Sequence, residues 1–290
     1  MSHAAILESP SCPTVPFEVK CDLLYWQARE DGTAIALNEG EVLYPDFDYH
    51  LGVRLLGAWQ MSHDAWRVGV QLTHFHARTT DNFPFAVVPT QPHPLRGINL
   101  ATEAFSRWRL HLGFVDLFLA RTAFYAPCIT PFIAVRFAGV RFKTRVEYTL
   151  PSGKVEDLSN KNKFWGIGPQ FGLVIEQALW RSLSLYAKGD LSLLLGSFYI
   201  HQDEQEKNNK KAGRMKFLDE KTEMRAVGEM ALGLCWSFSC FDIHAAWELT
   251  QLFGQNQMVQ FVDAETPGLF LSNLGDLTLQ GWTVGLSYCF

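Results

Sequence analysis

The feature that most constrains this chain is an alternation of apolar and polar residues with a period of two. It is clearest in residues 65–73, AWRVGVQLT, where the apolar positions are Trp66, Val68, Val70 and Leu72. Successive side chains of a strand point to opposite faces, so one face of this strand meets an apolar medium and the other meets water. The stretch therefore predicts a strand with two chemically different faces.

The same alternation recurs along the whole chain, and no stretch shows a sustained helical period. We therefore expect an all-β chain of about ten antiparallel strands (roughly eight to twelve), which form one domain over residues 17–290. The further stretches are residues 17–23, 51–59, 108–114, 131–137, 164–175, 182–195, 224–236, 241–249 and 281–290.

Two kinds of connection alternate along the chain, short ones and long polar ones. In an up-and-down arrangement this alternation places every short turn and both termini at one end. Such sorting, with an even number of strands, is typical of an outer-membrane β-barrel with short periplasmic turns and long extracellular loops. The short connections are residues 61–64, 120–128, 177–181 and 238–240, and the long ones are 29–48, 78–102, 151–163, 201–221 and 254–275.

Composition excludes several other classes of protein. Apolar residues make up 48% of the chain, which excludes a disordered protein, and the net charge of −5 argues against binding to nucleic acid. No apolar run reaches the length of about 18 residues that a transmembrane helix needs. Residues 1–16, expected to be an N-terminal periplasmic segment, show no basic stretch followed by an apolar one, so we expect no signal peptide in this sequence.

The apolar faces of the predicted strands carry more bulky side chains than a small barrel could enclose. Glycines recur on the polar faces, where they would relieve crowding in a narrow lumen. Aromatic residues at the strand ends match the two interfacial girdles of a membrane barrel. We therefore expect the apolar faces to meet lipid; a soluble, lipocalin-like ligand-binding barrel is the alternative. The aromatic residues are Trp59, Trp66, Trp108, Trp165, Trp236, Trp247, Tyr288 and Phe290.

Charged side chains on the polar faces would line the lumen. Buried charges must be paired or hydrated, which leaves two interpretations. One is a hydrated pore whose small basic excess favours anions; the other is an ion-pair network that closes a structural barrel. About ten strands favour a small or occluded pore. The pore-lining candidates are Arg54, Arg67, Arg109, Arg136, Lys188, Asp190, Arg225, Glu229, Asp242 and Glu248.

Several stretches resemble the Legionella-type major outer membrane protein family, which has relatives in environmental chlamydiae. They are FWGIGPQFGL (164–173), WELTQLFGQNQM (247–258) and GDLTLQGWTVGL (275–286), with weaker similarity in LLYWQAREDG (23–32) and ITPFIAVRFAGV (129–140). The resemblance implies a pore-forming or structural β-barrel in the outer membrane of a Gram-negative bacterium, and it supplies no catalytic residue.

The sequence contains no GxSxG, HExxH or GKS/T motif, so we expect neither an enzyme nor a bound cofactor. His74 and His76 share a face near the external rim and could hold a metal only weakly, so we interpret them as solvated residues rather than a metal site. The terminal Phe290 lies in phase with the last strand and resembles the signal that the barrel-assembly machinery reads.

All six cysteines are expected at or near the periplasmic end, where an oxidising compartment permits disulfides. Cys235 and Cys240 bracket a hairpin and are the candidate disulfide. The others could cross-link to envelope neighbours, an idea that the resemblance supports because chlamydial envelopes use cysteine-linked proteins; free buried thiols are the alternative. The remaining cysteines are Cys12, Cys21, Cys128 and Cys289.

The sequence thus predicts an outer-membrane β-barrel that acts as a porin-like channel for small solutes or ions, or as a structural envelope protein. Its expected partners are membrane lipid, the assembly machinery and the transported solute. A closed adhesion or anchor barrel without conductance and the soluble ligand-binding barrel are the alternatives.

Overall fold

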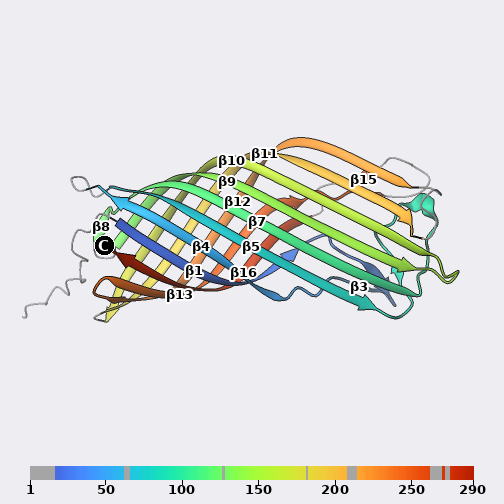
Figure 1. Cartoon of the computed structure of the whole chain (residues 1–290), viewed down its shortest axis with the longest axis horizontal. Coiled ribbons are helices and arrows are strands. Elements are labelled where there is room, and N and C mark those ends of the chain that lie inside the picture. Colours follow the sequence, from blue (N-terminus) through green and yellow to red (C-terminus); the bar gives the residue numbers. More distant parts are fainter. Residues whose placement is uncertain are drawn as a thin grey trace, which may run out of the picture.

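The protein folds into a closed antiparallel barrel of ten long strands (Figure 1). The computed structural model describes residues 17–61, 66–125, 128–180, 182–207, 214–261, 270–271 and 275–290. Strands that follow one another along the chain are neighbours in the barrel, and the last strand pairs with the first. This confirms the predicted up-and-down topology.

Each predicted alternating stretch falls on one barrel strand, and the stretches 65–73, 182–195 and 281–290 exceed their strand by one residue at one end. The barrel strands are β1 (Phe17–Glu30), β4 (Tyr49–Gln60), β5 (Trp66–Phe83), β7 (Glu103–Arg121), β9 (Cys128–Thr149), β10 (Val155–Trp180), β11 (Leu183–Glu206), β12 (Met215–Phe238), β13 (Phe241–Asn256) and β16 (Gly275–Cys289). The connections add β2 (Ala36–Asn38), β3 (Glu41–Leu43), β6 (Val88–Pro89), β8 (Phe124–Tyr125), β14 (Gln260–Phe261), β15 (Phe270–Leu271) and a short 3₁₀ helix (Pro94–Arg96). The part of the chain that the structure describes contains no helix long and apolar enough to span a membrane.

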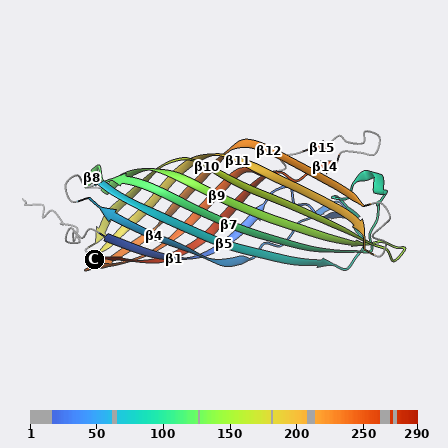
Figure 2. The ribbon, with the colours of Figure 1, turned by 45° about the horizontal axis from the view of Figure 1, so that its top comes forward.

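The two ends of the barrel differ in their connections (Figures 1 and 2). The C-terminus and β8 lie at one end, and β14 and β15 lie at the other. The end with the C-terminus holds the tight turn between β12 and β13, where Ser239 has a φ of 50°. At the same end, Phe17 and Phe290 exchange backbone hydrogen bonds of 3.3 and 3.0 Å. By the rule for outer-membrane barrels, this is the periplasmic end.

Two of the predicted long loops are wrong, because strands occupy much of them. The predicted loop 151–163 is a turn closed by a 2.8 Å hydrogen bond from Leu150 N to Lys154 O, and β10 begins at Val155. The predicted loop 201–221 contains the end of β11 and the start of β12. With 26 residues, β10 far exceeds the roughly 9–11 that cross a bilayer, so its polar first part extends beyond the membrane. The predicted turn at 177–181 is also wrong in its first four residues, because β10 continues to Trp180.

Apolar side chains cover the outside of the barrel between two rings of aromatic residues. Val53, Val70 and Leu232 are exposed on this band, which confirms that the apolar faces point away from the barrel axis. The upper girdle, on the extracellular side, consists of Tyr25, Tyr49, Trp165, Tyr199, Trp247 and Trp282; the lower girdle consists of Phe17, Trp59, Trp236, Phe238, Phe241, Tyr288 and Phe290. We call the wall between the girdles the membrane segment.

Beyond the upper girdle the pattern reverses, and we call this part of the wall the extracellular segment. Here the apolar side chains point inward. They belong to one buried cluster, which includes Trp26, Phe75 and Phe142 and begins at Leu24, one residue below Tyr25. The prediction that Trp108 belongs to a lipid-facing girdle is therefore wrong. Trp108 lies inside with Leu110, Leu112 and Phe114, and it is 1% exposed. The reason is that water, not lipid, surrounds this part of the wall.

Several predicted regions lie wholly or partly outside the described residues: the N-terminal segment 1–16 with its Cys12, most of the turn 61–64, and parts of the loops 201–221 and 254–275.

Candidate functional site: the lumen

The lumen holds three layers between the periplasmic and the extracellular end. The first is a cavity of about 570 Å³ whose lining includes Glu18, Lys20, Glu176 and Asp242. Above it lies a layer of paired charges, and above that lies the apolar cluster. Each layer is built by residues that far-separated strands contribute, so only the closed barrel brings them together.

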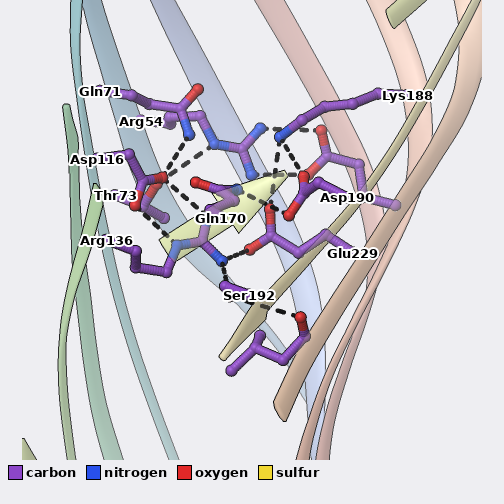
Figure 3. A network of polar contacts seen from close by, with 12 residues as sticks. Arg54, Gln71, Thr73, Asp116, Arg136, Gln170, Lys188, Asp190, Ser192 and Glu229 are labelled. Atoms are coloured by element: carbon purple, nitrogen blue, oxygen red, sulfur yellow. Dashed lines mark hydrogen bonds and ion pairs between the residues drawn. The ribbon is translucent and has the colours of Figure 1, made fainter. Parts of the chain in front are cut away.

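Arg136 is the centre of the charged layer (Figure 3). Its guanidinium, on β9, donates two hydrogen bonds of 2.7 and 2.8 Å to Asp116 on the neighbouring strand β7. A third, of 2.7 Å, reaches Glu229 on β12, three strands away around the barrel. The Arg136 side chain is 0% exposed. Bidentate and charge-assisted bonds of this length are the strongest that side chains form, so Arg136 ties two sides of the barrel together.

Lys188 extends the same group of charges (Figure 3). Its ammonium lies 3.0 Å from Asp190 and 3.4 Å from Glu229. Gln170 donates a 2.7 Å hydrogen bond to Asp190 from β10, so a neutral side chain also supports the carboxylate.

Arg54 forms a second group on the opposite strands. Its two terminal nitrogens each donate a 2.9 Å hydrogen bond to Glu248, from β4 to β13. It also lies 3.5 Å from Asp22, which in turn is 3.4 Å from His244. The guanidinium packs over the ring of Trp26 at 5.4 Å, where the charged layer meets the apolar cluster.

The charges of this layer balance closely. Its carboxylates are Asp22, Asp116, Asp190, Glu229 and Glu248, and its cations are Lys20, Arg54, Arg136 and Lys188. The basic excess that the sequence suggested is therefore absent from the described part of the layer. Each carboxylate lies within 4.0 Å of a cation.

Nine of the ten predicted pore-lining residues face the interior, and Arg109 does not. Arg109 is exposed on the outside of β7, because β7 turns its polar residues outward beyond the upper girdle. Among the other nine, Arg67 lies 2.8 Å from Glu18 beside the cavity. Asp242 accepts a 3.4 Å hydrogen bond from Ser287. Arg225 contacts Glu223 and packs over Phe198, at the level of the apolar cluster.

Sequence reasoning missed Asp116, which carries the bidentate bond to Arg136. The prediction puts the apolar residues of 108–114 on the outer face, which is wrong, and Asp116 shares the face of Phe114 because both positions are even. A signal was present: in VDLFLA (115–120) the bulky aliphatic residues alternate with Asp116 and point the other way. His244 and Gln170 were also missed as members of the layer.

Glycines on the inner wall make room for large rings, as the sequence predicted. A Cβ on Gly69 would lie 2.6 Å from the Phe118 ring, and one on Gly52 would lie 2.9 Å from Phe75. The interior is therefore filled by side chains that need these gaps in the wall.

The described Cys21, Cys128, Cys235 and Cys240 are free thiols. Cys235 points inward and lines the cavity, and Cys21 is exposed on the outer face. The Cys235–Cys240 disulfide is not formed in this structure and stays a prediction. His74 and His76 lie on the outer face of β5. Among the residues that the structure describes, no three His, Cys, Asp or Glu side chains are grouped to hold a metal ion.

A closed barrel with a lipid-facing apolar band between two aromatic girdles defines an outer-membrane β-barrel protein. Residues 9–290 match the family model described as Legionella pneumophila major outer membrane protein precursor, and the chain belongs to this family. It is a protein of the bacterial outer membrane and contacts the lipid of that membrane.

Two solved structures are similar to this chain, and the first of them shows the same fold. The outer membrane protease OmpT from Escherichia coli is 11% identical, with a TM-score of 0.57 over 98% of this chain and 100% of that chain. The translocator domain of the autotransporter NalP from Neisseria meningitidis is 12% identical, with a TM-score of 0.43 over 95% of this chain and 89% of that chain. At such identities the similarity concerns the fold alone. Among curated proteins, none matches the chain.

Proposed function

We propose that this protein is a structural barrel of the outer membrane whose lumen is closed to ions and small solutes. The observation that carries the proposal is the buried Arg136, which Asp116 and Glu229 hold from two other strands. An ion that crossed this layer would have to separate charges that already satisfy one another away from water, at a cost of several kcal/mol (about 3–5) for a broken buried pair.

The apolar cluster supports the same conclusion. Leu24, Phe75 and Leu194 are fully buried in the lumen directly beyond the charged layer. A hydrated ion gains nothing from such side chains, and apolar constrictions of this kind close pores by excluding water. Ten strands also stand close to the roughly eight whose interior side chains fill a barrel, and far from the 16 or so of an open porin.

A small-solute channel is the second candidate, and the cavity of about 570 Å³ favours it. Charged side chains such as Lys20 and Glu176 line this space on the periplasmic side. The cavity would form the periplasmic half of a path for solutes. Conduction would also require the charged layer and the apolar cluster to open.

Planar-bilayer recording of the full chain tests the proposal. We expect no stepwise conductance, while an open porin recorded in the same bilayers conducts. Steady steps from the wild-type protein would overturn the closed-lumen proposal and make the channel its function. In that case Arg54→Glu should change the ion selectivity, and Arg29→Glu, which reverses a charge on the outer face, should not.

The role of Phe290 in assembly is a further part of the proposal. Its side chain is exposed on the outer face, and its ring lies 5.2 Å from Phe17. An accessible terminal aromatic residue suits recognition by the barrel-assembly machinery. Phe290→Ala should lower the amount of protein in the outer membrane, whereas Phe17→Ala removes the same ring contact and should not. Equal losses in the two variants would show that the contact matters rather than the signal.

Disulfide links to envelope neighbours complete the proposal. The exposed Cys21 lies at mid-height of the lipid-facing band rather than at the expected periplasmic end, so its partner would be a thiol of a neighbouring membrane protein. A non-reducing gel of isolated envelopes should then show higher-mass species that Cys21→Ser abolishes. Identical migration with and without reductant would dismiss the links.

A further inference from the structure

Basic residues form a grid on one outer wall of the barrel, across strands β5, β7, β9 and β10. The register places His76 opposite His111, His111 opposite Arg141, and Arg141 opposite Lys163. The next row, further from the membrane, runs from Arg78 through Arg109 and Lys143 to Lys161 in the same way. With strands spaced at about 4.8 Å, each row spans about 15 Å.

Within the described residues these side chains lack carboxylate partners, and His76 contacts the backbone oxygen of Leu110 through its Nδ1 at 2.8 Å. Among the residues that the structure describes, no carboxylate lies within 4.0 Å of any member of the two rows. The nearest acidic residues on this wall, Glu147 and Asp157, lie further out and pair with Arg145 at 3.4 and 2.7 Å. Like charges directly opposite each other destabilise a sheet, so a bare grid of this kind is unfavourable unless an anion neutralises it.

Two members of the grid have lowered pKa values, mainly through burial and secondly through neighbouring basic residues. Burial and then the neighbouring His76 and Arg141 lower the pKa of His111. Burial and then Lys161 and Arg145 lower the pKa of Lys143. The rings of His76 and His111 stack with centroids 4.1 Å apart, so little space separates the members of the first row.

A notch in the wall lies directly below the first row, toward the membrane. Gly113 and Gly139 are paired in register, and a Cβ on Gly139 would meet nothing within 4 Å. The notch is a groove of about 650 Å³ that His111, Arg141, Lys163 and Trp165 also line. The missing side chains thus expose a recess between the basic grid and the upper girdle.

The notch continues into the lipid-facing band. A second groove, of about 590 Å³, shares Gly113, Gly139 and Trp165 with the first and extends to Val115 and Phe137. A molecule that filled both grooves would have an anionic part at the grid and an apolar part along the membrane segment.

The opposite wall lacks this arrangement. Beyond the upper girdle, β1, β13 and β16 present the neutral amides Gln27, Gln251 and Gln280 on their outer faces. On the described outer faces of these three strands beyond the girdle, Arg29 is the one basic residue, so the basic charge is concentrated on the side of the grid rather than spread evenly around the barrel.

We propose that the grid and the notch bind a phosphorylated, acylated lipid of the outer leaflet, with its phosphates on the two basic rows and an acyl chain in the groove at Gly139. Arginine and lysine suit phosphate oxygens, arginine because its planar fork can bind them bidentately. The extracellular position of the grid selects the outer leaflet. The proposal is independent of whether the lumen conducts.

Titration of the full chain in detergent with lipid A, an acylated disaccharide that carries phosphates, tests the proposal. Trp165 lies at the edge of the notch, so tryptophan fluorescence and native mass spectrometry should both report binding. The double variant Arg109→Ala/Arg141→Ala should weaken binding by on the order of tenfold or more. Arg29→Ala is the control. Arg29 faces outward on the opposite wall, four residues beyond Tyr25 of the upper girdle, and this variant should bind lipid A like the wild type. An equal loss in both would overturn the location of the site.

Two further arms test each part of the lipid. Gly139→Leu, which fills the open groove, should weaken lipid A severalfold, and unchanged binding would overturn the acyl-chain site. Lipid A without its phosphates should bind at least tenfold more weakly, and equal binding would overturn the phosphate site. If inorganic pyrophosphate displaced lipid A at equal concentration, the grid would be a site for a free anion and the lipid proposal would fail. Heat-dependent migration on SDS gels confirms that each variant is folded.

Discussion

The membrane segment and the extracellular segment are made of the same strands, yet their faces carry opposite chemistry. Strand β9 shows this within seven residues. Arg136 is buried in the lumen and Phe137 is exposed to lipid, whereas Arg141 is exposed outside and Phe142 is buried inside. The strand neither bends out of register nor contains a bulge here. The medium outside the wall therefore decides which face must be polar.

The two segments consequently obtain stability in different ways. The extracellular segment resembles a soluble barrel, with an apolar interior driven together by water. The membrane segment gains nothing from water on its outer face, and its interior depends on a charged layer in which each carboxylate lies within 4.0 Å of a cation. Substitutions of the same chemical kind should therefore have different costs in the two segments, and such pairs of variants test the comparison.

The largest effect should come from Arg136→Ala. It leaves Asp116 and Glu229 buried without their common partner, and breaking a buried pair on one side costs about 3–5 kcal/mol. Arg141→Ala, five residues along the same strand but exposed, should change the free energy of unfolding by only about 0.5 kcal/mol or less. Urea unfolding in micelles, followed by tryptophan fluorescence, measures both. Equal costs would refute the division into two segments.

A similar loss, of about 3–5 kcal/mol, should follow from Trp108→Ala in the extracellular segment. Trp108 is fully buried, and its indole nitrogen donates a hydrogen bond to Glu30. Trp282→Ala, in the upper girdle, removes a ring that is 53% exposed and should cost less than half as much. The same unfolding experiment compares them. If Trp282 proved the more costly, the interior position of Trp108 would be in error.

Val70→Arg tests the outer face of the membrane segment. A charge on the lipid face of a barrel near the midplane costs about 2–4 kcal/mol. Asn82→Arg, on the same face of β5 but beyond the upper girdle, should cost about 0.5 kcal/mol or less. A detergent micelle reproduces the apolar core of a membrane only in part. The free energy of unfolding of both variants should therefore be measured in bilayers of defined lipid. If Val70→Arg lowered the free energy of unfolding only slightly, the outer face of the membrane segment would have to be in contact with water rather than lipid.

The comparison also explains how much could be predicted from the sequence. Alternation fixes which residues share a face, and this was sufficient for all ten strands and for the outward position of residues such as Val53 and Leu232. It does not say which medium each face meets. In β7 the residues 108–114 have an apolar set and a polar set, and only their height above the girdle shows that the apolar set is inside.

Two other features could not be predicted for a related reason. The strands of the extracellular segment carry polar residues outward, so their sequences, such as residues 155–163, read as loop. The partners in the charged layer depend on the closure of the barrel: Arg136 and Glu229 are 93 residues apart, and no local pattern links them. What the sequence did contain was a switch of parity, visible in β9 between Phe137 and Val140, where bulky apolar residues change face.

The smallest effect should be a pH dependence that Glu30 introduces in the extracellular segment. Glu30 lies inside the barrel, five residues beyond Tyr25 of the upper girdle, and burial raises its pKa to about 8. The folded protein then holds a proton that the unfolded chain releases near pH 4.5. Stability from this group is therefore greatest below about pH 4.5 and falls as the pH rises to about 8, because the unfolded state binds fewer protons across that range.

Glu30→Gln removes this titration and keeps an oxygen that can accept the hydrogen bond from Trp108. The variant should be less stable than or equal to the wild type at pH 4, and more stable at pH 9 by about 1–3 kcal/mol. For a chain of this size such a gain raises the unfolding temperature by several degrees, at about 2–4 °C for each kcal/mol. Glu41→Gln, which removes an exposed carboxylate on β3, is the control for a change of net charge. A constant difference between Glu30→Gln and the wild type across the pH range would mean that Glu30 is already ionised in the folded barrel, and hence that water reaches the interior of the extracellular segment.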